Sequence, residues 1–249
     1  MIVWLLGGRS FWRRPMAKPA TWPSFSGIWA TRTSRSGKIW ADVSELSTDA
    51  RLVDEAVEAI RAGKPVVLPT DTVYGLCATP YKSEPVLRMY ALKGRDEQQP
   101  TALLASGLDM LFECVPELRS RVGPIARALL PGPLTLILPN PARRFRWLTG
   151  SRPDTIGVRV PQLAGVGREI VQRVGAVAAT SANLAGGLDP KRLDEVPEAI
   201  RDGAAVLVDG GELPGTPSTV LDLSGPEPQV VREGAVPAAE VLERLGQLV

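Results

Sequence analysis

The sequence contains no histidine. This absence removes the commonest general base and the commonest zinc ligand of proteins. A Ser-His-Asp triad, a Cys-His pair and a histidine-based metal site are therefore excluded. Any catalysis has to come from substrate positioning, charge neutralisation, carboxylates, lysine, or a metal that a substrate carries.

Cysteine is scarce as well. Cys77 and Cys114 are the only two, and neither has a second cysteine nearby. No disulfide framework is implied, and a reducing compartment is the natural interpretation, so we interpret both as core residues. The apolar run from Ile2 to Leu6 is too short for the core of a signal peptide and far too short to span a bilayer. We therefore expect a cytoplasmic protein without a membrane partner.

Acidic residues are missing from residues 1–40, which contain seven Lys or Arg and five of the six tryptophans. The other 209 residues carry 22 basic and 27 acidic groups, so they do not form a generally basic nucleic-acid binder. We interpret residues 1–46 as an atypical extension, either disordered or translated from a misassigned start upstream of Met16. An organelle transit peptide is the alternative, and it would change the localisation but not the chemistry. Residues 47–249 are expected to form one catalytic domain.

The two commonest nucleotide-binding motifs are absent. The chain has no G-x-x-x-x-G-K-[ST] sequence, which excludes the P-loop mechanism. No G-x-G-x-x-G sequence follows a predicted strand, so dinucleotide binding is unsupported. A phosphate-binding function would therefore have to use other residues.

Hydrophobic periodicity becomes regular from Thr48 onward. Thr48 or Asp49 is placed to cap a first helix that Gly63 terminates, and Ser83 is placed to cap a second with Pro85 in its first turn. Further helices are predicted over 117–130, 163–174 and 236–246, and strands over 65–68, 101–105, 134–138, 156–160, 176–180, 205–209, 218–223 and 229–233. This alternation predicts an α/β fold with helices packed on a mixed sheet.

Three polar segments follow predicted elements. The loop PTDTVYGL, residues 69–76, offers hydroxyls, a carboxylate and backbone amides at a sheet edge. Lys93-Gly94-Arg95 can aim two cations at one polyphosphate. Thr180-Ser181-Ala182-Asn183 precedes two glycines that allow close approach of a phosphate. Each segment taken singly is also compatible with an ordinary turn, cap or basic helix end.

Together with four further segments, these motifs resemble the YrdC-like threonylcarbamoyl-AMP synthase family. The matching segments, in order and spacing, are PTDTVYGL, KGR, PGPLTLIL, IGVRVP, TSANLAGG, PSTVLD and VREG. The resemblance covers roughly residues 50–246, as expected for the short, single-domain form of the family. The resemblance implies a twisted mixed sheet with flanking helices, the YrdC/RibB-like fold, and a large concave electropositive site.

The resemblance also implies an activity. Members convert L-threonine, bicarbonate and ATP into L-threonylcarbamoyl-AMP and pyrophosphate, with Mg²⁺ carried by ATP and no metal ligand expected from the protein. A partner tRNA threonylcarbamoyl transferase complex then modifies the adenosine beside the anticodon. Binding of tRNA or double-stranded RNA is a further possibility that the family raises.

For ATP, the resemblance points to two motifs. Lys93 and Arg95 match the K-x-R motif that grips the phosphates, and we predict that they are the catalytic residues. Ser181 and Asn183 match the S-x-N motif that holds the nucleotide. Other positions matching ATP contacts are Gln99, Thr155, Asp189 and Arg232.

For threonine, the resemblance points to residues of three motifs and to Ala179, which directly precedes TSANLAGG. Arg159 would pair with the substrate carboxylate. The other residues expected to line the threonine pocket are Thr72, Tyr74, Ala179 and Ser218.

The chain departs from the family pattern just after the K-x-R motif. Asp96 and Glu97 stand beside the expected phosphate clamp, where they would weaken its positive field, and a histidine of some members falls at Leu104. The usual second serine of S-A-N-x-S-G is Ala185. Two alternatives remain open at this point: a non-catalytic nucleotide- or double-stranded-RNA-binding module on the same fold, and a carbamoyl-transferring domain of the hydrogenase-maturation type.

Overall fold

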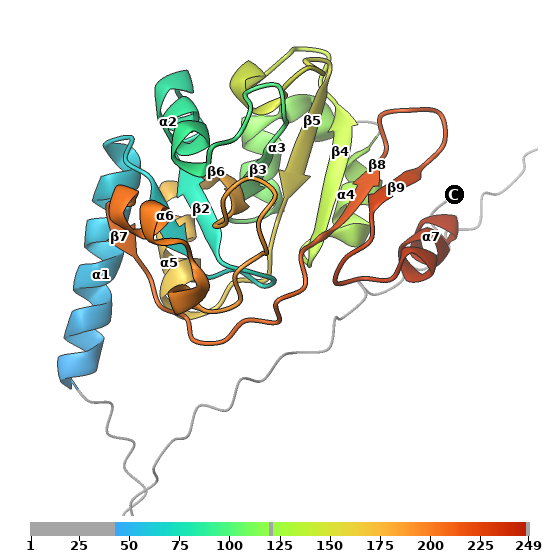
Figure 1. Ribbon diagram of the computed structural model, residues 1–249. Helices are drawn as coiled ribbons and strands as arrows, with labels where there is room; N and C mark the ends of the chain where they lie inside the picture. The colour runs from blue at the N-terminus through green and yellow to red at the C-terminus, as the bar shows by residue number, and fades with distance from the viewer. Residues whose placement is uncertain (1–42, 120–121, 248–249) are drawn as a thin grey trace, which may run out of the picture.

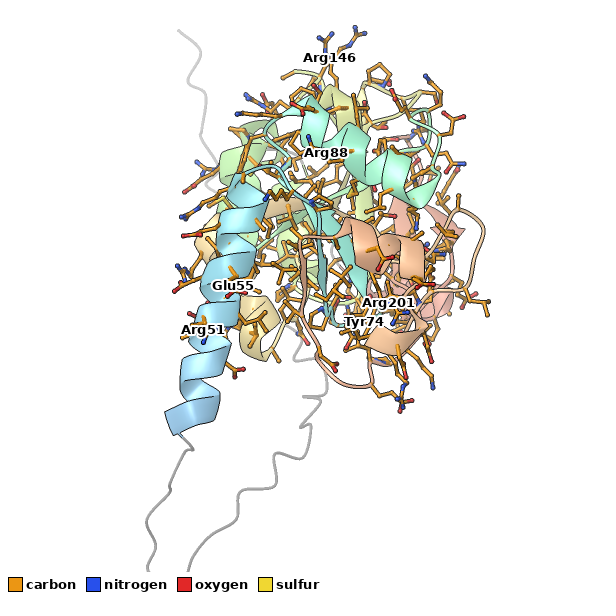
Figure 2. All side chains as sticks on the ribbon, turned by 60° about the vertical axis from the view of Figure 1, so that its left-hand side comes forward. Arg51, Glu55, Tyr74, Arg88, Arg146 and Arg201 are labelled. Atoms are coloured by element: carbon orange, nitrogen blue, oxygen red, sulfur yellow. The ribbon has the colours of Figure 1, made fainter. Side chains whose placement is uncertain are left out.

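The computed structural model describes residues 43–119 and 122–247 (Figure 1). Residues 1–42, which make up nearly all of the predicted N-terminal extension, lie outside the described residues. The first helix, α1 (Val43–Arg61), begins before the predicted capping positions. Thr48 and Asp49 lie inside it, so their prediction as N-caps is wrong. The helix is amphipathic, with Arg51 and Glu55 projecting into solvent (Figure 2).

The strands of the described residues form one nine-stranded sheet in the order β7-β1-β2-β6-β3-β5-β4-β8-β9. The pairs β1/β7, β3/β5 and β4/β8 are parallel and the other five pairs are antiparallel, so the predicted mixed sheet is confirmed. The strands are β1 (Val66–Leu68), β2 (Gly75–Ala78), β3 (Ala102–Ala105), β4 (Leu134–Pro139), β5 (Thr155–Arg159), β6 (Ala176–Ser181), β7 (Val206–Leu207), β8 (Thr219–Asp222) and β9 (Gln229–Arg232).

The helices pack on both faces of the sheet. Helix α1 and helix α5 (Gly165–Val174) pack together against one face through residues such as Val57 and Ile170. The opposite face is covered by the larger hydrophobic cluster, to which most of the other helices contribute. These other helices are α2 (Ser83–Lys93), α3 (Leu108–Cys114), α4 (Gly123–Leu129), α6 (Glu198–Gly203) and α7 (Ala238–Gly246), with short 3-10 turns at 116–119, 146–148 and 193–195.

Two predicted helices differ in detail. Ser83 is the first residue of α2 rather than its cap, because Lys82 holds the capping position without a side-chain bond. The single helix predicted over 117–130 is wrong, because a 3-10 turn ends at Arg119 and α4 begins separately at Gly123. Pro124, which has no N–H to donate, stands in the first turn of α4, where a proline begins a helix rather than continuing one. The sequence patterns also missed β2, α3 and α6.

Side-chain alternation along the strands creates the polar face on which the site is built. Leu134, Leu136 and Leu138 of β4 are fully buried in the larger cluster. Thr135 and Ile137, which lie between them, line a pocket on the opposite face. The same alternation in β5 buries Ile156 and Val158 and turns Thr155, Gly157 and Arg159 toward that pocket. Helices α1 and α5 cover only part of the face that carries the pocket. The part formed by β3, β4, β5, β6 and β8 therefore stays open.

Candidate functional site

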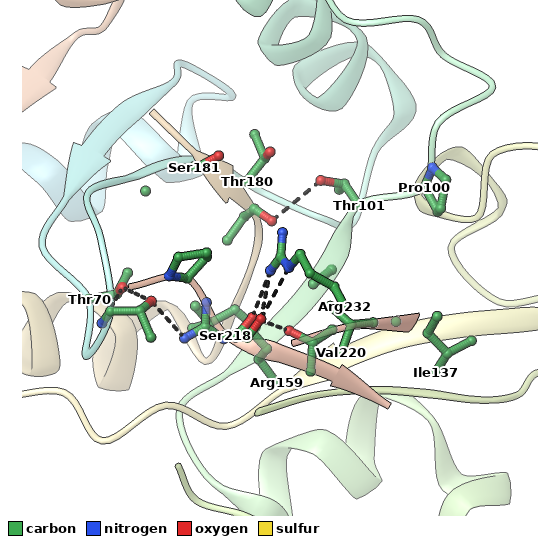
Figure 3. Close-up of a pocket in the computed structure, with 18 of the residues that line it drawn as sticks. Thr70, Pro100, Thr101, Ile137, Arg159, Thr180, Ser181, Ser218, Val220 and Arg232 are labelled. Carbon is green, nitrogen blue, oxygen red and sulfur yellow. Dashed lines mark hydrogen bonds between the residues drawn. The ribbon is translucent and has the colours of Figure 1, made fainter. Parts of the chain in front are cut away.

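The pocket over this open face is strongly cationic. Four arginines line it, from four different segments: Arg95, Arg152, Arg159 and Arg232 (Figure 3 shows the last two). Asp189 is the one acidic residue among the described residues that line it. Hydroxyl groups supply most of the remaining polar surface. A site of this composition is suited to an anionic ligand that carries several oxygens.

Nine of the predicted site residues line this pocket. They are Thr72, Arg95, Thr155, Arg159, Ala179, Ser181, Asp189, Ser218 and Arg232. Residues that lie far apart in the sequence are therefore brought together on one face of the sheet. The roles predicted for them stay predictions.

Lys93 lies behind the pocket wall rather than on it. The residue is 3% exposed, and its ammonium donates to the carbonyl of Ser181 at 2.6 Å and to the side-chain oxygen of Asn183. The Ser181 hydroxyl donates to the same Asn183 oxygen at 2.7 Å. The K-x-R and S-x-N motifs thus form one hydrogen-bonded unit. Lys93 lies where it can stabilise the Ser181–Asn183 turn and add its charge to any anion bound there.

The backbone at the end of α2 separates Lys93 from Arg95. Gly94 has φ 64° and ends the helix, with the Arg95 amide bonded to the Tyr90 carbonyl at 2.9 Å. A left-handed residue at this position favours glycine because it has no Cβ. The chain turns here, so that Lys93 points under β6 while Arg95 reaches the pocket.

Arg95 is held only in part by the protein. Its two terminal nitrogens donate to the Pro100 carbonyl at 2.6 Å and to the Thr180 hydroxyl at 3.4 Å. Its buried Nε has no partner among the described residues. Burial lowers the pKa of this guanidinium, and the charge of Arg232 contributes to the lowering. An anion bound in the pocket would relieve the repulsion between the two cations.

Arg159 forms a nearly buried ion pair with Asp71. The two side chains are 12% and 9% exposed, and their closest atoms are 2.7 Å apart. The second oxygen of Asp71 accepts the Gln162 amide at 3.0 Å, and Arg159 also donates to the Thr72 hydroxyl at 3.2 Å. The Arg159 Nε is buried without a partner among the described residues. Asp71 and Thr72 of the PTDTVYGL motif thus hold Arg159, which comes from β5, in place.

Ser218 and Arg232 are joined at the far side of the pocket (Figure 3). Arg232 donates to the Ser218 carbonyl at 2.8 Å and to its hydroxyl at 3.2 Å. That hydroxyl also lies 2.8 Å from the hydroxyl of Thr135. Since Ser218 is predicted to contact threonine and Arg232 to contact ATP, their contact places the two predicted subsites side by side.

Besides Lys93, three predicted residues lie off the pocket surface, namely Tyr74, Asn183 and Gln99. Tyr74 is fully buried, and its hydroxyl donates to Asp209 at 3.0 Å and to the Gly211 carbonyl at 2.8 Å. Burial raises the pKa of Tyr74 to about 12. Its observed contacts tie the 209–211 loop to β2, which is a structural role. Direct contact of these three residues with a substrate remains a prediction.

The segment that departs from the family pattern is held away from the pocket floor. Asp96 and Glu97 are exposed and do not line the pocket, whereas Leu104 does. Gly150, with φ 57°, lets the Gln98 carbonyl approach so closely that a Cβ would lie 2.2 Å from it. The Ser151 amide donates to the same carbonyl at 3.1 Å. The loop that carries Gln99 and Pro100 is therefore fixed by the 149–151 segment.

Sequence reasoning missed several pocket residues. The most important is Arg152, which lines the pocket and pairs with Asp222 at 2.9 Å. The missed hydroxyl residues are Thr101, Thr135 and Thr149. Alternation within LTLIL at 134–138 could have identified Thr135, because the residues on either side of it are leucines. Arg152 lies in a turn, and no sequence pattern marks it.

Comparison with known proteins identifies the family. A model of the Sua5/YciO/YrdC family, described as telomere recombination, matches residues 58–234. The chain belongs to this family. The threonylcarbamoyl-AMP synthase of Pseudomonas syringae is 35% identical over 188 residues, covering 73% of this chain and 97% of that protein. The human threonylcarbamoyl-AMP synthase is 31% identical over 218 residues, covering 84% of this chain and 76% of that protein.

Solved structures of the Sua5/YciO/YrdC family share the fold. The structure of Pyrococcus abyssi Sua5 complexed with L-threonine has a TM-score of 0.72 and 32% identity, covering 80% of this chain and 58% of that one. This chain thus spans less than two thirds of the P. abyssi protein. Escherichia coli YciO has a TM-score of 0.65 and 26% identity, covering 77% of this chain and 92% of that one. The predicted fold and family are confirmed.

Two negative observations concern the described residues alone. No helix in 43–119 or 122–247 is long and apolar enough to cross a membrane. In the same ranges, no group of three or more Cys, Asp or Glu side chains is arranged to hold a metal ion.

Proposed function

We propose that this chain is an L-threonylcarbamoyladenylate synthase, a nucleotidyltransferase that forms threonylcarbamoyl-AMP and pyrophosphate from L-threonine, bicarbonate and ATP. The product serves threonylcarbamoyladenosine modification of tRNA, through a separate transferase complex. The observation that carries the proposal is a single pocket in which the residues matching the family's ATP and threonine positions meet. Relatives named threonylcarbamoyl-AMP synthase, aligned over most of this chain, support it.

The geometry suits the chemistry in two ways. Arg159, fixed by Asp71, lines the pocket and can present its guanidinium to the threonine carboxylate. Arg95, Arg232 and the Ser181 hydroxyl offer donors to phosphate oxygens. The unprotonated amine of threonine first combines with bicarbonate, which gives N-carboxy-threonine and releases water. A carbamate oxygen of N-carboxy-threonine then attacks the α-phosphorus of ATP, and pyrophosphate leaves. Positioning and charge neutralisation carry this step, so no histidine and no protein nucleophile is needed.

Mg²⁺ enters as part of the nucleotide substrate. In magnesium–nucleotide complexes the ion usually keeps several waters and takes one or two carboxylates together with the phosphates. The pocket suits this arrangement because it offers arginines for the phosphates and only one carboxylate among the described residues.

The decisive experiment is pyrophosphate release from purified protein mixed with ATP, L-threonine and bicarbonate. Release that requires all three is the expected result, and mass spectrometry should detect threonylcarbamoyl-AMP. Omitting threonine provides the internal control for simple ATP hydrolysis. If ATP binds but no threonine-dependent release occurs, the non-catalytic nucleotide- or RNA-binding alternative replaces this proposal.

Nucleotide affinity is expected to fall as pH rises above about 8. Burial, helped by the charge of Arg95, lowers the pKa of Lys93 to about 8, while Asp189 opposes the shift. The ammonium is therefore charged below this pH and loses its proton above it. Isothermal calorimetry with α,β-methylene-ATP between pH 7 and pH 9.5 measures the effect. A flat affinity profile would contradict the role of Lys93 as a phosphate-binding cation.

The lowered pKa of Lys93 also predicts how the stability of the free protein changes with pH, and measuring this dependence is the control for the binding experiment. In the unfolded chain Lys93 has its ordinary pKa of 10.5, so it stays protonated to a higher pH than in the folded protein. The unfolded state thus binds more protons between about pH 8 and 10.5, and this group makes the free protein more stable as pH rises through that range. Lys93→Met should remove this contribution from the denaturation profile.

A further inference from the structure

Asp189 stands out in the pocket because its charge is unpaired. The two other carboxylates that bond to pocket arginines are both occupied, Asp71 with Arg159 at 2.7 Å and Asp222 with Arg152 at 2.9 Å. Asp189 lines the pocket, is half-buried, and forms no hydrogen bond or salt bridge with the described residues. A free carboxylate among four arginines therefore needs an explanation other than ion pairing within the protein.

The backbone around Asp189 holds it close to the phosphate-binding motifs. The carbonyl of the next residue, Pro190, accepts the Tyr74 amide at 2.9 Å. The Ala182 amide in turn donates to the Tyr74 carbonyl at 2.8 Å. Asp189 is thus tied through Tyr74 to the turn that carries Ser181 and Asn183. Its charge acts on the buried Lys93 ammonium, which lies under the same turn.

This placement conflicts with the binding of a bare polyphosphate. A carboxylate beside the cations that receive phosphate oxygens repels those oxygens, and it weakens the positive field that attracts them. A divalent cation placed between the carboxylate and the phosphate oxygens attracts both and so removes their repulsion. Mg²⁺ prefers oxygen ligands and is commonly bound by one or two carboxylates together with substrate phosphates and water.

We propose that Asp189 is a direct ligand of the Mg²⁺ ion that arrives with the nucleotide. The inference rests on the proposed function only in taking a nucleoside triphosphate as substrate. The donor set fits, since one free carboxylate is present and no group of three or more acidic or cysteine side chains in the described residues could hold the ion alone. The phosphates and water supply the other ligands. The chain thus contributes a metal ligand, where sequence reasoning expected none.

The threonine ammonium is the other cation that a free carboxylate could bind. The surroundings of Asp189 favour the metal. Its charge acts on Lys93, behind the Ser181–Asn183 turn, whereas Arg159, which is expected to bind threonine, takes its opposite charge from Asp71. The test below separates the two cations because the first measurement contains no threonine.

The test follows Mn²⁺ bound with α,β-methylene-ATP, by electron paramagnetic resonance or water proton relaxation. Asp189→Asn is expected to weaken Mn²⁺ binding in the ternary complex by about tenfold or more, since a charge-assisted ligand is lost. Glu97→Gln is the matched control. It removes the same charge near the phosphate clamp, from an exposed side chain that does not line the pocket. Its Mn²⁺ affinity should stay within about twofold of the wild type.

A second variant keeps the proposal testable if Asp189→Asn disturbs the fold, which thermal unfolding would show. Asp189→Cys places a softer ligand at the same position, and it should shift the metal preference of the nucleotide complex from Mg²⁺ toward Cd²⁺. A residue that acted only through its charge would not produce this shift. The same variants are then assayed for pyrophosphate release as a function of Mg²⁺ and of threonine concentration.

The outcomes are distinct. Weaker Mn²⁺ binding in Asp189→Asn with an unchanged threonine KM supports the proposal. A raised threonine KM with unchanged Mn²⁺ binding overturns it and assigns Asp189 to the substrate ammonium. Equal Mn²⁺ affinities in wild type, Asp189→Asn and Glu97→Gln also overturn it. A wild type that binds Mn²⁺–nucleotide through Asp189 but releases no pyrophosphate contradicts the synthase function and leaves the metal ligand standing, whereas absence of any nucleotide binding overturns both.

Discussion

Replacing Arg95 with alanine is expected to lower kcat/KM for threonine-dependent pyrophosphate release by about 100- to 1000-fold, the usual effect of removing a preorganised charge-stabilising donor. The guanidinium lies in the pocket wall, close enough to Arg232 for the two charges to repel each other. A phosphate bound between them therefore gains from both cations. Steady-state kinetics at saturating threonine and bicarbonate, with varied ATP, measures the loss.

Two further variants show whether the loss of activity in Arg95→Ala comes from the geometry of the guanidinium or from its charge alone. Arg95→Lys keeps the charge but loses the planar fork, so it should recover only a small part of the activity. Arg88→Ala removes another arginine that projects from α2 (Figure 2), where it pairs with Glu84 at 2.7 Å on the surface. Its activity should match the wild type. Similar losses in Arg88→Ala and Arg95→Ala would mean that the net charge, and not the pocket geometry, is responsible.

Replacing Arg159 with methionine should remove threonine use and also destabilise the fold. The substitution leaves Asp71 buried without its partner, and breaking a buried ion pair in this way costs about 3–5 kcal/mol. The Asp71 side chain is 9% exposed, so water cannot replace the guanidinium fully. Urea denaturation measures the stability, and calorimetry measures threonine binding.

A double variant separates the two effects. In Asp71→Asn/Arg159→Met no buried charge remains at the ion pair, so much of the lost stability should return, as for buried pairs replaced together. Threonine binding should stay absent, because no cation remains at that position for the carboxylate. If the double variant regained threonine binding together with stability, Arg159 would have only a structural role, and the threonine subsite would have to lie elsewhere in the pocket.

Local sequence patterns located most of the fold because each strand carries its own periodicity. The apolar runs at Val66–Leu68 and Leu134–Pro139 were predicted as strands and are strands. The elements that were missed have weaker signals. Strand β2 (Gly75–Ala78) begins with a glycine inside a polar motif, and α3 and α6 have seven and six residues, too few for a clear helical period.

The site was predictable in composition but not in arrangement. Ordered motifs selected the residues that line the pocket, including Arg95, Arg159, Ser181, Ser218 and Arg232. The contacts among them depend on which strands become neighbours in the sheet. Asp71 meets Arg159 across 88 positions of sequence, and Lys93 meets Asn183 across 90. No local pattern encodes such pairs, because they form only when β5 and β6 take their places.

The absence of histidine, read from the sequence alone, determined that catalysis at this site proceeds without imidazole. The motifs, by their residue types, determined that the site is rich in hydroxyls and cations. Tertiary structure decided how each charge is used: Lys93 is buried behind the wall, Asp71 and Asp222 are paired with arginines, and Asp189 has no ion-pair partner within 43–119 and 122–247. The physical reason is that pairing and desolvation depend on neighbours in space, which the packing of the sheet and its helices fixes.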